Sequence, residues 1–250
     1  MARLPGDRAA GAGARAARGH FVTGGWNPPP RRRVVFWRHG RTEWNVANRF
    51  QGATDVALDD VGLAQAAAAA PAIAGMRPDA IVSSDLARAS ATAQVLADLV
   101  GLTVGRDPGL RETDGGDWQG RSREEIIARD EALFLAWVAG HDVRPPGGEA
   151  RSEVVARVIA AVDRRVADLP PGGTLVVVSH GGAIRAGIGG LLGLAPEQWT
   201  GLGVISNCAW SVLSQLNLPG EPGGAPVTRW RLEEYNAAAA PAPAIGADDA

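Results

Sequence analysis

The chain has 250 residues, of which 46% are hydrophobic and 21% are charged, and its formal net charge is −2. These values are ordinary for a globular protein and leave enough apolar surface to build a core. No apolar run reaches the ~18 residues that a membrane span requires, and the single cysteine, Cys208, excludes an intrachain disulfide and a multi-cysteine metal site. A lone cysteine favours a reducing compartment, so we expect a cytoplasmic protein.

The composition also excludes two classes of enzyme. All 25 basic residues are arginine, and lysine is absent. A Walker-type phosphate-binding loop needs its lysine to reach the nucleotide phosphates, and a Schiff-base enzyme needs a lysine amine to form its covalent intermediate. The chain is therefore neither a Walker-type nucleotide-binding protein nor a Schiff-base enzyme that uses lysine.

Both ends of the chain are expected to be disordered. Residues 1–33 carry seven arginines against one aspartate, and glycine, alanine and proline dominate the segment. The segment lacks helical periodicity, has few aromatic residues and contains no signal-peptide core, so we expect no nucleic-acid or membrane partner. Residues 237–250 are rich in alanine and proline. We therefore expect disordered segments at 1–33 and 237–250 and a single domain over 34–236.

Between these ends, short apolar runs alternate with helical patterns. Five runs rich in apolar, β-branched or aromatic residues predict strands: 33–37, 80–82, 174–178, 209–216 and 227–232. Five segments predict helices: 61–75, 86–100, 122–139, 151–168 and 183–193. In the fourth helix valines recur on one face, and Arg157, Asp163 and Arg164 are expected to face water. This alternation predicts an α/β fold: a three-layer sandwich whose mainly parallel sheet has helices on both faces.

Polar residues gather where three of the predicted strands end. Arg38 and His39 follow the first strand, Arg88 lies one helical turn after the second, and His180 and Gly181 follow the third. Because ligands collect at the carboxyl ends of parallel strands, we expect these residues to lie together. Two imidazoles and two guanidinium groups would repel a cation but suit a tetrahedral dianion, and a helix starting at Gly181 would add backbone N–H donors. The alternative is that each histidine is a structural residue.

Five ordered motifs make the chain similar to one known family. The motifs are 38–45 (RHGRTEWN), 83–89 with 92–93, 110–112 with 116–120, 147–149, and 179–182. In order and rough spacing they resemble the motifs of the histidine phosphatase (phosphoglycerate mutase-like) superfamily from residue 34 to about 236. The resemblance implies the phosphoglycerate mutase-like α/β fold and phosphoryl transfer without a metal or other cofactor.

The resemblance also implies a role for each matching position. His39 would be the nucleophile that forms a phosphohistidine, and Glu112 would protonate the leaving oxygen and then activate water. His180 would complete the catalytic set beside the phosphoryl group. The other matching or neighbouring positions would bind phosphate or substrate: Arg38, Arg88, Asn45, Thr42, Gly181, Arg41, Arg111 and Glu149. Such a site is physically reasonable, because a covalent intermediate divides one difficult displacement into two easier ones and the arginines supply positive charge.

Two alternatives to a phosphatase stay open. A phosphoglycerate mutase has similar core motifs, but it typically follows the catalytic glutamate with Arg-His-Tyr-Gly and carries a longer insertion. Here Glu112 is followed by Thr-Asp-Gly-Gly, and the stretch before Gly147 is short. The other alternative is a non-catalytic phosphate-binding protein, although His39, Glu112 and His180 are all present. We therefore favour a phosphomonoester hydrolase.

One of the motifs and two segments outside the motifs narrow the expected substrate. Residues 110–120, 207–210 and 229–232 look like the matching parts of actinobacterial glucosyl-3-phosphoglycerate phosphatases. We expect a small phosphorylated metabolite such as glucosyl-3-phosphoglycerate, with Arg41 and Arg111 as candidate partners for its carboxylate. The oligomeric state stays open, with a homodimer as one option. Cys208 is expected to be a small buried residue rather than a second nucleophile.

Overall fold

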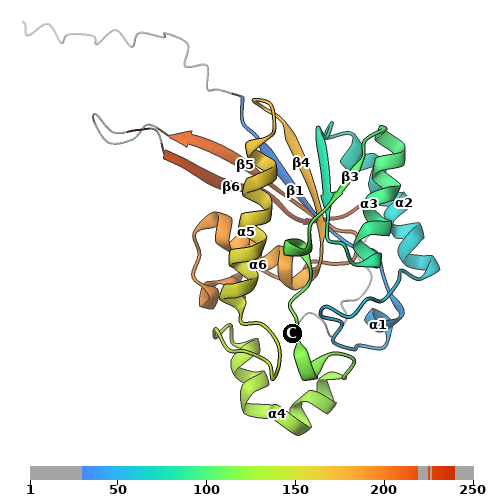
Figure 1. Ribbon diagram of the computed structural model, residues 1–250, viewed down its shortest axis with the longest axis vertical. Helices are drawn as coiled ribbons and strands as arrows, with labels where there is room; N and C mark the ends of the chain where they lie inside the picture. The colour runs from blue at the N-terminus through green and yellow to red at the C-terminus, as the bar shows by residue number, and fades with distance from the viewer. Residues whose placement is uncertain (1–29, 219–224, 226, 240–250) are drawn as a thin grey trace, which may run out of the picture.

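The computed structural model describes residues 30–218, 225 and 227–239 (Figure 1). Most of the expected N-terminal extension, 1–29, and the C-terminal residues 240–250 lie outside the described residues. At the boundaries of the expected domain, Arg33 already belongs to the first strand and Ala237 still belongs to the last. The regular elements therefore begin and end one residue outside the range 34–236.

A single six-stranded sheet forms the centre of the fold. Its strands are β1 (Arg33–Arg38), β2 (Ala80–Ser83), β3 (Val104–Arg106), β4 (Thr174–Ser179), β5 (Trp210–Leu218) and β6 (Val227–Ala237). Their order across the sheet is β3-β2-β4-β1-β5-β6. The first four in this order pair in parallel, whereas β5 and β6 add an antiparallel edge. The predicted mainly parallel sheet is confirmed; β3 was not predicted, because a three-residue strand at the sheet edge leaves little pattern in the sequence.

Helices cover both faces of this sheet. They are α1 (Glu43–Val46), α2 (Asp60–Ala74), α3 (Ala87–Val100), α4 (Arg123–Val138), α5 (Arg151–Ala167) and α6 (Gly181–Leu192). Figure 1 shows α5 and α6 on one side of the sheet, α2 and α3 on the other, and α4 beyond the lower ends of the strands. The predicted three-layer sandwich is confirmed, and α4 adds a small aromatic cluster outside these layers.

Side chains of the central strands point alternately to the two faces of the sheet, and each face has its own hydrophobic core. In β1, Val34 and Phe36 pack with the α5 and α6 side, whereas Val35 and Trp37 pack with the α2 and α3 side. Side chains of a strand point alternately to opposite faces, so a strand buried on both faces must be apolar throughout. This requirement explains why β1 and β4 read as continuous apolar runs.

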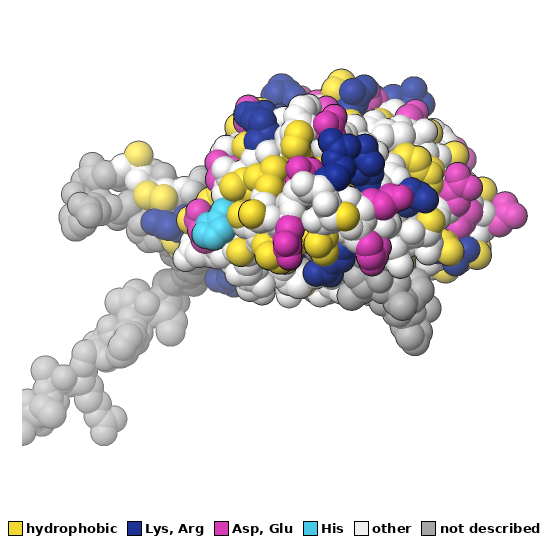
Figure 2. Space-filling view, turned by 90° about the horizontal axis from the view of Figure 1, so that it is seen from below, with side chains coloured by type: hydrophobic (Ala, Val, Ile, Leu, Met, Phe, Trp, Pro, Cys, Tyr) yellow, Lys and Arg dark blue, Asp and Glu magenta, His cyan; other side chains and the backbone are white. Residues whose placement is uncertain are grey.

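The described residues carry charge of both signs and no long apolar helix. No helix in residues 30–218 and 227–239 is both long enough and apolar enough to cross a membrane. Figure 2 shows that acidic and basic side chains are interspersed over the face that carries α4. Attraction of an anion to this face therefore depends on a local arrangement of cations rather than on a surface of one sign.

The central strand β4 gives a direct test of the packing. Leu175 in β4 is 0% exposed, whereas Leu99 in α3 is 55% exposed. We expect Leu175→Ala to lower the free energy of unfolding by about 2–5 kcal/mol, because it leaves a cavity between sheet and helices. The matched control Leu99→Ala should change it by less than about 0.5 kcal/mol. Urea unfolding followed by circular dichroism measures both, and equal losses would contradict this packing.

Candidate active site

Two histidines meet at the carboxyl edge of the sheet. Arg38 at the end of β1 is in register with Ser179 at the end of β4, so the next residues, His39 and His180, lie side by side. Their ring centroids are 5.1 Å apart, and their planes are tilted by 58°. Both side chains are buried, with exposures of 2% and 0%. The parallel register predicted from the two strand ends therefore brings the imidazoles into one site.

A backbone carbonyl orients the ring of His39. Its Nδ1 lies 2.7 Å from the carbonyl oxygen of Gly40. Because a carbonyl oxygen only accepts hydrogen bonds, Nδ1 carries the proton, and in the neutral ring Nε2 keeps its lone pair. The backbone is fixed as well: the His39 N–H donates to Ser179 O, and the His39 carbonyl accepts from the Asn207 side chain at 3.1 Å.

Gly40 can be nothing other than glycine in this backbone. A Cβ at Gly40 would lie 2.3 Å from the carbonyl oxygen of Gly62, in the first turn of α2. The N–H of Gly40 donates to Thr92 Oγ1 at 3.1 Å. Contacts to α2 and α3 thus fix the backbone of Gly40, whose carbonyl orients His39, and the Arg41 N–H of the same peptide as that carbonyl donates to Gln65 Oε1 at 2.9 Å.

The ring of His180 is held by two protein partners. Its Nδ1 accepts a hydrogen bond from Arg88 Nε at 3.1 Å, so the proton of the neutral ring sits on Nε2, which donates to Ser84 Oγ at 2.9 Å. Arg88 is fully buried and also donates to the carbonyls of Thr54 and Gly52, each at 2.8 Å. Arg88 and His180 therefore form one hydrogen-bonded unit.

Burial and neighbouring arginines keep both imidazoles neutral. The pKa of His39 lies well below its usual value, first because of burial and then because of the charges of Arg88 and Arg38. The pKa of His180 is also well below its usual value, again through burial first and then through Arg88, His39, Arg38 and Arg157. Burial disfavours a charge of either sign, but the positive charges of the arginines that contribute to these lowered pKa values favour an incoming anion.

The Glu112 side chain contacts the first turn of α6, the helix that begins directly after His180. Its Oε1 accepts from the backbone N–H groups of Thr113 at 2.7 Å and Ala183 at 2.9 Å, and its Oε2 accepts from Gly182 at 2.9 Å. A Cβ at Gly182 would lie 2.7 Å from Oε1, so any larger residue there would displace the carboxylate. These contacts attach the carboxylate rigidly to the helix that His180 begins.

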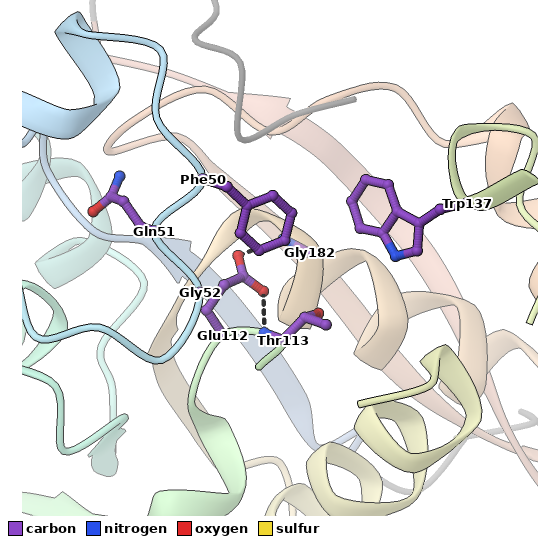
Figure 3. A pocket seen from close by; sticks show the side chains of 7 residues that line it. All are labelled: Phe50, Gln51, Gly52, Glu112, Thr113, Trp137 and Gly182. Atoms are coloured by element: carbon purple, nitrogen blue, oxygen red, sulfur yellow. Dashed lines mark hydrogen bonds between the residues drawn. The ribbon is translucent and has the colours of Figure 1, made fainter. Parts of the chain in front are cut away.

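The same contacts change the expectation for the helix N-terminus. The N–H groups after Gly181 were expected to bind phosphate, but those of Gly182 and Ala183 donate to Glu112. Figure 3 shows the carboxylate facing a small cavity. This cavity of about 20 Å³ holds roughly one water molecule. Its lining residues are Phe50, Gln51, Gly52, Glu112, Thr113, Trp137 and Gly182.

Thr42 and Asn45 bind each other at the start of α1. Thr42 is the N-cap residue, and its Oγ1 accepts from the Asn45 N–H at 3.2 Å. The Asn45 side-chain oxygen in turn accepts from the Thr42 N–H at 3.0 Å and from Asn207 Nδ2 at 3.3 Å. The structure therefore assigns the buried Thr42 hydroxyl to a helix cap, a different role from the expected substrate contact.

The two arginines expected to bind a carboxylate already have acidic partners. Arg41 Nε donates to Asp59 at 2.8 Å and lines neither described cavity near Glu112. Arg111 donates to both oxygens of Asp85, at 2.8 and 2.6 Å, and this pair lowers the pKa of Asp85. Arg111 also lines a cavity of about 230 Å³ together with Glu112, so its contact with a substrate carboxylate stays a prediction, as does that of Arg41.

Arg157 faces inward rather than toward water, so that prediction from the α5 pattern is wrong. It donates to both carboxylate oxygens of Glu149, at 2.9 and 2.8 Å, and to the carbonyls of Gly109, Arg111 and Glu112. Glu149 also accepts from the Asp114 N–H at 2.9 Å. The ion pair fixes the loop around Glu112, and because Glu149 also lines a cavity with Glu112, its expected substrate-binding role stays a prediction. The hydrophobic periodicity of a helix cannot predict that a polar residue such as Arg157 turns toward a neighbouring loop.

Cys208 is buried, as predicted. Burial raises the pKa of its thiol to about 12, so the thiolate required for nucleophilic attack is not formed at neutral pH. Among the described residues, no group of three or more histidine, cysteine, aspartate or glutamate side chains is placed to hold a metal ion.

The lowered histidine pKa values predict a pH-dependent stability. Below about pH 6.5 the unfolded chain binds protons that buried His39 and His180 resist, so the free energy of unfolding falls as the pH falls. Between pH 7.5 and 5.5 the free energy of unfolding of His39→Asn should fall less than that of the wild type, by on the order of 1 kcal/mol. His141→Asn, at an exposed loop position, should behave as the wild type. Urea unfolding at both pH values measures these free energies. A decrease in His39→Asn as large as in the wild type would contradict the argument that burial keeps His39 neutral.

Comparison with known proteins identifies the family. The model of the histidine phosphatase superfamily (branch 1) matches residues 34–218. A glucosyl-3-phosphoglycerate phosphatase of Mycolicibacterium vanbaalenii is 41% identical over 215 residues, which cover 83% of this chain and 96% of that protein. A similar protein of Mycobacterium tuberculosis, with the same name, is also 41% identical, with the same coverage of both chains.

Solved structures agree with the sequence comparison. A mycobacterial glucosyl-3-phosphoglycerate phosphatase in complex with VO3 is 41% identical and has a TM-score of 0.76, covering 83% of this chain and 100% of that one. The complex of such an enzyme with inorganic phosphate gives 40% identity and a TM-score of 0.74, covering 83% of this chain and 98% of that one. With this agreement in motifs, fold and sequence, the chain belongs to the histidine phosphatase superfamily.

Proposed function

We propose that this protein is a metal-independent phosphatase that hydrolyses a small phosphomonoester through a phosphohistidine at His39. The observation that carries this proposal is the hydrogen bond from His39 Nδ1 to the Gly40 carbonyl. It leaves the Nε2 lone pair available in a buried site whose arginines favour an anion. Family membership supports the same chemistry.

In the first step, the Nε2 lone pair of His39 attacks phosphorus and the bond from phosphorus to the ester oxygen breaks. Glu112 gives its proton to the departing oxygen, because an alkoxide is a poor leaving group. Oε2 is the oxygen for this proton, since it accepts one backbone hydrogen bond whereas Oε1 accepts two. The positive charges of Arg38 and Arg88 stabilise the negative charge on the phosphoryl oxygens, and the Nε2–H of His180 exchanges its bond to Ser84 Oγ for one to a phosphoryl oxygen.

In the second step, water attacks the phosphohistidine. Glu112, now ionised, takes a proton from the water as its oxygen bonds to phosphorus, and the bond from Nε2 to phosphorus breaks. Inorganic phosphate leaves, and His39 returns to its neutral form. The backbone contacts at the start of α6 keep the same carboxylate in place for both proton transfers.

The proposed substrate is a carboxylate-bearing metabolite of the glucosyl-3-phosphoglycerate type. The names of the 41% identical relatives support this class, and they favour hydrolysis over a mutase reaction. We propose residues 34–236 as the catalytic unit, without a nucleic-acid or membrane partner, and a cytoplasmic location. A homodimer remains compatible with this proposal.

Replacement of the nucleophile tests the proposed reaction. We expect His39→Asn to lose hydrolysis of p-nitrophenyl phosphate and of 3-phosphoglycerate by at least ~10³-fold, because no other nitrogen in the site has an available lone pair. His141→Asn, at an exposed position, should keep wild-type rates. Colorimetric phosphate release measures both. Near-normal turnover by His39→Asn would mean that water attacks phosphorus directly.

The role of Glu112 is tested by the leaving group. Glu112→Gln should slow glycerol 3-phosphate hydrolysis by ~10²–10⁴-fold, the usual contribution of general acid catalysis. The loss on p-nitrophenyl phosphate should be much smaller, since nitrophenolate leaves without a proton. Glu131→Gln, exposed on α4, is the matched control. Equal losses on both esters would show that Glu112 positions groups rather than transfers a proton.

A further inference from the structure

Three nitrogen donors near Glu112 have no hydrogen-bond acceptor. They are Trp137 Nε1, Arg151 Nε and Arg185 Nε, and each atom is buried. Buried donors are nearly always paired in folded proteins, so a cluster of three points to an absent acceptor. None of these residues belongs to the catalytic set proposed above.

Trp137 connects this cluster to the catalytic cavity. Its indole lines the cavity together with Glu112 and Gly182, and Figure 3 shows it across that space from Phe50 and the carboxylate. The Arg151 guanidinium lies 4.4 Å from the centroid of the Trp137 ring, and Arg151 Nη2 donates to the Trp137 carbonyl at 2.6 Å. Arg151 is therefore fixed directly behind one wall of the cavity.

Arg185 brings a second positive charge from α6, one turn after Gly182. The pKa of Arg151 is lowered to about 10, first by burial and then by the charge of Arg185, while Asp142 and Glu112 act in the opposite direction. The two guanidinium groups thus repel each other close to Glu112. A bound anion would relieve that repulsion.

These two arginines differ from three other arginines around the site. Arg41, Arg111 and Arg157 each form an ion pair with a carboxylate. Among the residues that the structure describes, no carboxylate oxygen lies within 4.0 Å of Arg151 or Arg185. Their positive charges are thus not paired with a carboxylate within the described residues.

We propose that Arg151 and Arg185, with the indole N–H of Trp137, form a subsite for a carboxylate on the alcohol part of the substrate. Donors without acceptors require an acceptor, two unpaired cations require an anion, and the guanidinium fork matches a carboxylate. The cavity of about 20 Å³ beside Trp137 has room for one oxygen of the carboxylate, and Arg151 and Arg185 lie outside its lining residues, behind Trp137 and along α6. This subsite rests on the proposed function. The phosphoryl group must lie at His39 for the alcohol part of the substrate to extend past Glu112 toward the two arginines.

The test compares two esters that differ in the carboxylate. The full chain is assayed with 3-phosphoglycerate and with glycerol 3-phosphate, in which a hydroxymethyl group replaces that carboxylate. We expect Arg151→Gln and Arg185→Gln to lower kcat/KM for 3-phosphoglycerate by about 10- to 100-fold, the effect of a lost hydrogen bond to a charged group. On glycerol 3-phosphate the loss should stay below about threefold. Arg129→Gln, exposed on α4, is the control and should leave both rates unchanged.

A binding measurement separates the subsite from the reaction. In the presence of inorganic phosphate, D-glycerate should bind the wild type at least about 10-fold more tightly than glycerol in a calorimetric titration. Glycerate binding without turnover would contradict the proposed function and support the subsite. Hydrolysis without a preference for glycerate over glycerol, or equal losses of the variants on both esters, would overturn the subsite alone. The comparison of D-glycerate with glycerol on the wild type tests the subsite even if a variant fails to fold.

Discussion

The hydrogen bond between His39 Nδ1 and the Gly40 carbonyl is the contact on which the site depends. It fixes the tautomer of the ring, and the tautomer determines which nitrogen has a lone pair for phosphorus. The Gly40 peptide can adopt its position only because two glycines, Gly40 and Gly62, touch where β1 passes the start of α2. The proposed nucleophile is therefore oriented by backbone packing, and burial, followed by the charges of Arg88 and Arg38, keeps it neutral.

A second rigid unit faces this ring. His180 is the N-cap residue of α6, and the next N–H groups of that helix hold Glu112. Arg88 joins the unit through His180, and Arg157 fixes the Glu112 backbone from α5. The proposed acid and the second histidine consequently move together. Preorganisation of this kind is what phosphoryl transfer requires, because the protein acts mainly through position and charge.

The sequence predicted the residues that follow the strands but not the residues that pair with them. His39, His180 and Arg88 lie at predictable places because parallel strands end at one edge of the sheet. The engagement of Arg41 by Asp59 and of Arg111 by Asp85 depends on loop conformation, which no periodicity encodes. Arg151 and Arg185 went unnoticed for a related reason: a charged residue on a helix is usually exposed, and their burial depends on how α4, α5 and α6 pack.

The protonation state of His39 at neutral pH is the most direct test of this account. Nitrogen-15 NMR of the full chain with labelled histidine distinguishes the Nδ1–H tautomer, the Nε2–H tautomer and the imidazolium, and His39→Asn assigns the signal. The account predicts a neutral His39 with its proton on Nδ1, unchanged from pH 7.5 to below the ordinary histidine pKa of about 6.5. A proton on Nε2, or an imidazolium at pH 7, would contradict it.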